Sequence, residues 1–161
     1  RHLFPNGVYF EDSYWQHLIM DEVKNYGVLP KPLYYYRQRE EGISGTFSLN
    51  NMDLLRGNEL RLEFIKENYP SLTNEMAASF WKNFYSIYQI ARKHPDAKIR
   101  VAYRDEWRRV NIKYRDDFSK ALRTDPCYRL YSDIPGLLKV YNLVYRVYDR
   151  LFGKGLRKIS Y

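Results

Sequence analysis

Cysteine is almost absent from this chain, and long apolar runs are absent altogether. A single cysteine, Cys127, stands among 161 residues, which excludes an internal disulfide or a cysteine-rich metal site and fits a reducing compartment. No run of about 18 apolar residues occurs, so we expect no segment that spans a bilayer on its own. The chain opens on Arg1 rather than Met, without a charged-then-apolar leader, which favours a piece of a longer protein.

Metal-binding patterns are also missing. The sequence has no Asp-x-Asp motif and no His or Cys residues at metal-ligand spacing. The adjacent acids Asp116 and Asp117 lie inside a strongly helical run, which indicates a solvated helix face. We therefore expect no metal site within these residues.

Tyrosine and positive charge are plentiful instead. Aromatic residues make up 17% of the chain, most of them tyrosine, and tyrosine suits core margins, sugar-stacking faces and membrane interfaces. The net charge of +8 favours an anionic partner, such as nucleic acid, a nucleotide diphosphate or acidic lipid. Charge alone does not choose among these partners.

Apolar periodicity predicts a mainly α protein. Side chains recur at helical spacing over residues 12–26, 51–68, 72–93, 97–122 and 134–152, and short connections favour antiparallel neighbours in a bundle. The glycine at position 27 is the expected end of the first helix. High β-propensity predicts a short β remnant near residues 28–38, with a strand over 33–37.

An acidic pair stands at the start of the first predicted helix. Glu11 and Asp12 follow an aromatic residue and precede Tyr14 and Trp15. Acidic residues at this position commonly cap the helix, because a carboxylate accepts an orphan backbone N–H and meets the positive end of the dipole. A carboxylate fixed in this way can also serve as a general base. Tyr14 and Trp15 could stack on a sugar ring or simply pack in the core.

A tyrosine-rich segment ending in arginines follows some twenty residues later. Arg37 and Arg39 alternate along the predicted strand, so both point to one face. They could pair with neighbouring glutamates on a solvated edge, or bind a diphosphate or an anionic acceptor with the guanidinium fork. Ser44 follows in a glycine-containing loop.

The order of these elements resembles the closing catalytic half of the bacterial family 2 glycosyltransferases, of the GT-A type. In that family an aromatic-Glu-Asp element is followed by a Tyr-Tyr-Arg-x-Arg strand, and the match covers roughly residues 1–45. The resemblance implies that Asp12 is the catalytic base, that Glu11 supports it, and that substrate contacts come from Trp15, Tyr14, Arg37, Arg39 and Ser44. Residues 1–48 would then end a catalytic domain, and residues 49–161 would form a helical C-terminal extension.

The resemblance also implies what the chain needs for activity. The family binds a nucleotide sugar and a divalent metal in an N-terminal half that these residues do not contain, so we expect this chain to be inactive alone. Its reaction would transfer a sugar to a saccharide or lipid-linked acceptor in surface polysaccharide synthesis. The expected location is the cytoplasm, peripheral to the inner face of the membrane.

Basic residues gather along one side of the last predicted helix and beyond it. They are Lys139, Arg146, Arg150, Lys154, Arg157 and Lys158, opposite a stripe of leucine, tyrosine and valine. A basic amphipathic helix of this kind can lie on an anionic membrane surface. The alternative is a bundle helix whose polar face is basic.

Two other classes of function stay open. One is a non-catalytic helical module that docks on a membrane, on another protein or on a second copy of the chain. The other is a basic nucleic-acid-binding domain, which is disfavoured because acids interrupt the basic residues at 105–109 and no recognition motif occurs.

Overall fold

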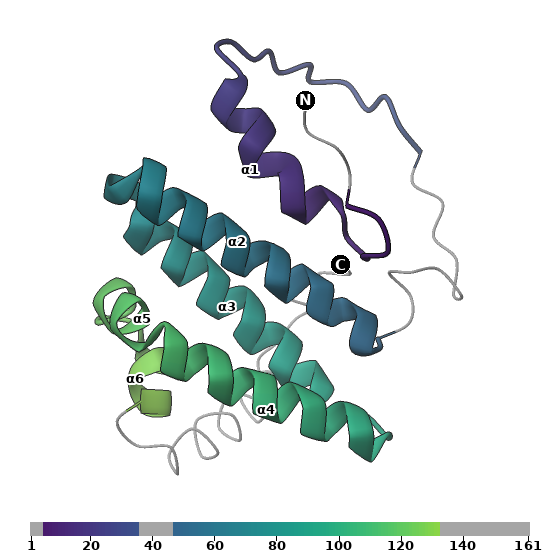
Figure 1. The fold of residues 1–161 in the computed structure, drawn as a ribbon, viewed down its shortest axis with the longest axis vertical. Coiled ribbons are helices and arrows are strands. Elements are labelled where there is room, and N and C mark those ends of the chain that lie inside the picture. Colours follow the sequence, from purple (N-terminus) through teal and green to yellow (C-terminus); the bar gives the residue numbers. More distant parts are fainter. Residues whose placement is uncertain (1–4, 36–46, 133–161) are drawn as a thin grey trace, which may run out of the picture.

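The computed structural model describes residues 5–35 and 47–132, and these residues form a helical bundle (Figure 1). Its α-helices are α1 (Asp12–Glu22), α2 (Met52–Asn68), α3 (Thr73–Ala91), α4 (Ala97–Lys113), α5 (Arg115–Ala121) and α6 (Pro126–Ser132). Short 3-10 turns precede α2 at Leu49–Asn51 and α3 at Pro70–Leu72. The mainly α prediction is confirmed.

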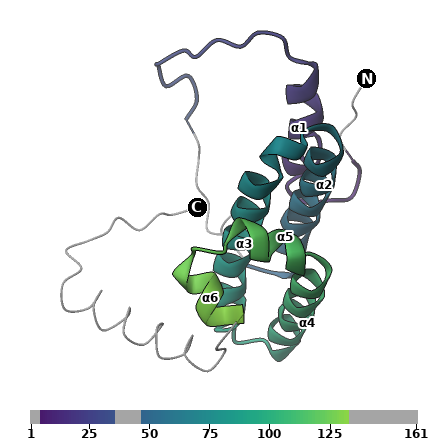
Figure 2. The same cartoon turned by 90° about the vertical axis from the view of Figure 1, so that its left-hand side faces the viewer.

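The core lies where α3 meets its neighbours. Consecutive helices α2, α3 and α4 run antiparallel, and α5 also packs on α3 (Figures 1 and 2). The side chains that α3 contributes are almost fully buried and mostly aromatic, namely Phe80, Trp81 and Phe84. Burying such large apolar rings is the main source of stability in a bundle of this size.

Two predicted helix boundaries agree closely with the structure. The segment predicted over 51–68 forms α2 at Met52–Asn68, and the one predicted over 72–93 forms α3 at Thr73–Ala91. Ser48 caps the 3-10 turn that leads into α2 through a capping box, in which its hydroxyl accepts from the Asn50 N–H at 3.2 Å and its own N–H donates to Asn51 at 2.8 Å.

The prediction of one long helix over residues 97–122 is wrong. The helix breaks at Tyr114, whose backbone leaves the helical region at φ −108° and ψ 24°. The break turns α5 so that it packs on α3 and Phe118 reaches Phe80, with ring centroids 5.8 Å apart. Helical spacing persists on both sides of the break, so periodicity alone did not reveal it.

The first helix is also shorter than predicted. It ends at Glu22 rather than at residue 26, and Val23 is already extended. The hydroxyl of Tyr69, which directly follows α2, donates to Asp21. The ends of α1 and α2 therefore lie close together, and residues 23–35 that follow are all exposed.

Residues 23–35 form an extended arm that runs away from the helices (Figures 1 and 2). The described part of the predicted β remnant, residues 28–35, contains no strand, so the structure does not support that detail over these positions. A strand needs a partner for its backbone groups, whereas the backbone bonds here are local: Val23 donates to the Ile19 carbonyl at 3.2 Å and Lys31 to the Leu29 carbonyl at 2.8 Å. The predicted helix over 134–152 lies outside the described residues.

Helix α6 was not predicted. The sequence Thr124-Asp125-Pro126, just after the predicted helix end at residue 122, starts a helix. The Asp125 carboxylate accepts from the N–H groups of Cys127 and Tyr128 at 2.9 and 3.2 Å. An aspartate cap followed by proline at the first helical position is a known start signal.

Candidate functional site

The acidic pair lies at the start of α1, as predicted, and both side chains are exposed. Glu11 occupies the N-cap position but has helical backbone angles, and its side chain makes no capping hydrogen bond. The N–H groups of Ser13 and Tyr14 are satisfied by the carbonyls of Phe10 and Glu11, at 2.9 and 3.1 Å. The capping alternative therefore does not account for Glu11.

Phe10, directly before the pair, has a left-handed backbone at φ +57°. This conformation is uncommon for a residue with a large side chain and costs about 1–2 kcal/mol. Ser13 holds the turn in place, because its hydroxyl donates to the Phe10 carbonyl at 2.8 Å. The backbone that presents the two carboxylates is thus fixed by a local strained turn.

Ser13 also sets how closely α1 approaches α2. It is a buried polar residue, and it packs directly on Gly57. A Cβ atom built on Gly57 would lie 2.1 Å from the Ser13 Oγ, far inside contact distance. Glycine is therefore required at position 57 for the first turn of α1 to dock where it does.

Arg61 lies on the next turn of α2 and reaches the same part of α1. Its Nη2 donates to the Ser13 carbonyl at 3.4 Å and to the Gln16 side chain at 3.1 Å. Burial lowers the pKa of the Arg61 guanidinium, and the nearby negative charge of Asp12 acts in the opposite direction. The guanidinium thus lies within electrostatic range of the Asp12 carboxylate.

The predicted aromatic platform is only half exposed. Tyr14 and Trp15 are both of intermediate burial, so neither is a core residue nor a free surface residue. The Tyr14 hydroxyl is buried without a hydrogen-bond partner in the part of the chain that the structure describes. Burial, and then the charge of Asp53, raise the pKa of this hydroxyl.

The other predicted substrate residues, Arg37, Arg39 and Ser44, lie outside the described residues, and so do all the predicted membrane-surface residues. Over residues 5–35 and 47–132, no group of three or more His, Cys, Asp or Glu side chains could hold a metal ion. In α5, Asp117 is engaged by Lys66, with a nitrogen–oxygen distance of 2.8 Å. Within the same ranges, no helix is both long and apolar enough to cross a bilayer.

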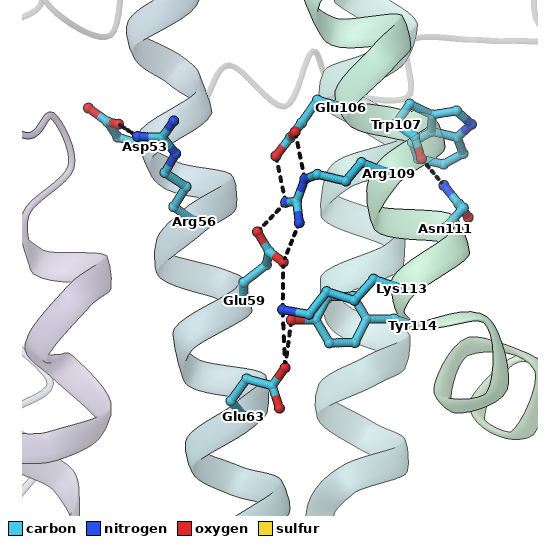
Figure 3. Close-up of polar contacts among 10 residues, drawn as sticks. All are labelled: Asp53, Arg56, Glu59, Glu63, Glu106, Trp107, Arg109, Asn111, Lys113 and Tyr114. Carbon is cyan, nitrogen blue, oxygen red and sulfur yellow. Dashed lines mark hydrogen bonds and ion pairs between the residues drawn. The ribbon is translucent and has the colours of Figure 1, made fainter.

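A network of charges joins α2 to α4 on the side away from α1 (Figure 3). Arg109 binds Glu59 of α2 and Glu106 of its own helix, and Lys113 contacts Glu59 and Glu63 at 3.4 and 3.3 Å. The hydroxyl of buried Tyr114 donates to Glu63 at 2.8 Å. Acids and bases at matching four-residue spacing on the two helices were a sequence signal for this pairing. These contacts form a structural clamp between α2 and α4, made by Glu59, Glu63, Glu106, Arg109, Lys113 and Tyr114.

The sequence did not reveal Ser13, Gly57 or Arg61 as parts of the site. Their contacts join residues more than forty positions apart, as with Ser13 and Arg61, and no local pattern predicts which face of α2 receives α1. Comparisons with protein-family models, curated proteins and solved structures found no match to this chain.

Proposed function

We propose that residues 5–35, of which α1 is docked on α2, are the acceptor side of a glycosyltransferase, with Asp12 as its catalytic base. The observation that carries the proposal is the exposure of this region. Large apolar side chains of the arm stay exposed, at 80% for Tyr26, 82% for Val28 and 76% for Leu33. Met20, near the end of α1, is also exposed, at 55%. The helices behind the arm bury most of their apolar side chains in the core and expose only scattered ones, such as Leu60 at 51% and Ile112 at 77%.

Such a surface is unusual for a domain that is complete on its own. Contiguous exposed apolar side chains mark a surface that another protein part covers. The proposed cover is the nucleotide-binding half of the catalytic domain, which would pack on the arm and bring the donor to the exposed carboxylates. This partner agrees with the family that residues 1–45 resemble.

The proposed reaction needs one proton acceptor on this side. Asp12 takes the proton of the acceptor hydroxyl while its oxygen attacks the anomeric carbon of the donor sugar. The bond from that carbon to the nucleotide phosphate breaks, and the nucleotide diphosphate leaves with the bonding electrons. In the family that residues 1–45 resemble, the divalent metal is held by the nucleotide-binding half, which these residues do not contain.

Replacement of Asp12 in the organism that encodes the chain tests the proposal. The native gene is exchanged for an Asp12→Asn allele, and surface polysaccharide is measured by gel at equal protein level. Loss of a positioned base lowers a rate by about 10²–10⁴-fold, so the polysaccharide should disappear. Asp116→Asn, an exposed aspartate of α5, is the matched control and should leave it unchanged.

Unchanged polysaccharide in the Asp12→Asn strain would reject the catalytic assignment. The chain would then be a non-catalytic docking module, since the exposed apolar arm would still require a partner.

A further inference from the structure

Arg61 joins the acidic end of α1 to the helical part of the chain. The first turn of α1 rests on two successive turns of α2, with Ser13 on Gly57 and the Arg61 guanidinium on the Ser13 carbonyl. Ser13 directly follows Asp12, and Gln16, the other Arg61 partner, lies one helical turn after Asp12 on the same face. Arg61 therefore contacts the residues that flank Asp12 along this face of α1.

We propose that Arg61 is a positioning residue for Asp12, so that the catalytic site is composite and includes the helical part of the chain. This inference rests on the proposed function. It changes the expected division of the protein, because residues 49–161 would then contribute to the site rather than follow it as an extension.

The chemistry of the guanidinium supports this role. Arg61 is half-buried, and its Nε is buried without a hydrogen-bond partner in the described part of the chain. A partly desolvated cation is costly unless an opposite charge lies close by, and Asp12 is the nearby acid. The Nη2 atom donates to both Gln16 and Ser13, which holds the guanidinium against the part of α1 that begins with Asp12.

The other cations of α2 differ in their partners. Lys66 lies further along the helix and pairs with Asp117 of α5. Arg56 pairs with Asp53 of its own helix at 3.7 Å. Lys66 is therefore a matched control, since its loss removes a cation and an ion pair from the same helix without touching α1.

The test uses alleles in the organism that encodes the chain, with polysaccharide and protein level measured together. Displacement of a catalytic group by about 1 Å can cost about 10²-fold in rate, so Arg61→Gln should lower the product roughly 10- to 100-fold. Arg61→Lys should restore part of the loss, because lysine keeps the charge but lacks the fork. Lys66→Gln should match the wild type.

The outcomes separate this inference from the proposed function. Activity that survives Asp12→Asn rejects the proposed function itself. Activity that is lost in Asp12→Asn but equal in Arg61→Gln and Lys66→Gln overturns only the role of Arg61. If Arg61→Gln protein does not accumulate, Arg61→Lys decides: a several-fold loss supports the proposal, and wild-type output overturns it.

Discussion

Ser13 of α1 and Gly57 of α2 are in such close contact that the glycine has no room for a side chain. The nearest Ser13 atoms to a Cβ built at Gly57 are Oγ at 2.1 Å, Cβ at 2.9 Å and the carbonyl carbon at 3.2 Å. Two of these belong to a short, buried side chain and the third to the backbone, so none can move aside cheaply. The position of the acidic pair therefore depends on a residue in the middle of another helix.

Gly57→Ala should displace α1 from α2. Overpacking of this kind costs about 1–3 kcal/mol, offset in part by the better helix propensity of alanine. Amide hydrogen exchange should show lower protection in α1, while α3 and α4 keep theirs. Gly27→Ala is the control, because nothing lies within 4 Å of its added Cβ. Equal protection of α1 in both variants would contradict the tight contact.

The clamp between α2 and α4 should make stability depend on acid. Burial would raise the pKa of Glu59, but hydrogen bonds and charge from Arg109, together with Tyr114 and Lys113, outweigh it, and the pKa is lowered from 4.5. Because the folded pKa lies below the unfolded one, this stabilisation is fully present above about pH 4.5 and is lost as the pH falls through the folded pKa.

Glu59→Gln removes that dependence. It should cost roughly 1–3 kcal/mol of unfolding free energy near neutral pH, since it removes charge-assisted hydrogen bonds, and the cost should shrink in acid. Urea unfolding at several pH values between neutral and acid measures both effects. Glu67→Gln, at an exposed position of the same helix, is the comparison. A pH-independent cost would show that packing, rather than charge, is what Glu59 provides.

The sequence predicted the parts of the fold that are marked locally. The prolines at 70 and 95 limit α2, α3 and α4, and the helical spacing between them is regular, so α2 and α3 were predicted nearly to the residue. The predicted end of α1 was wrong because the true end depends on where α2 stops. Gly27, the predicted end, lies in the arm. The break at Tyr114 brings Phe118 to Phe80 of α3, a contact that the local sequence does not mark.

The site was predicted only in its local part. Glu11 and Asp12 do stand exposed at a helix start, because the signal for that lies in adjacent residues. Arg61 and Gly57 could not be found, since their roles arise only when α1 docks on one face of α2. An isolated arginine within a charged helix carries no sign of its partner.

The arm should cause self-association of the isolated chain. Its exposed apolar side chains include Leu33 at 76% and Tyr35 at 99%, and exposed apolar side chains of this kind favour association. Light scattering should show oligomers that grow with concentration, and Leu33→Ser with Tyr35→Ser should reduce them. Ile112→Ser, at a 77% exposed position on α4, should not. A monodisperse monomer at high concentration would show that the arm needs no cover.

The basic C-terminal residues should bind anionic vesicles. Each lysine or arginine near such a surface contributes roughly 1 kcal/mol, and residues 139–158 contain six of them. Co-sedimentation compares the whole chain with one ending at residue 133, using anionic and neutral vesicles at two salt concentrations. Binding by the whole chain alone, released by salt, is expected. Equal binding by both chains, or by neither, would remove the membrane role from this segment.

Two optical signals can follow the aromatic core and the contact between α1 and α2 separately. Trp107 stacks on Tyr88 with ring planes only 3° apart, and Trp81 stacks on Tyr85 at 9°, whereas Trp15 lies on α1. Stacked, immobile rings dominate near-ultraviolet circular dichroism, while the emission wavelength of one indole follows its own solvent contact. Release of α1 would therefore shift the fluorescence of Trp15 and leave the dichroism of the core intact. The fluorescence of Trp15 therefore reports whether the helix that holds the proposed catalytic residues is docked on α2.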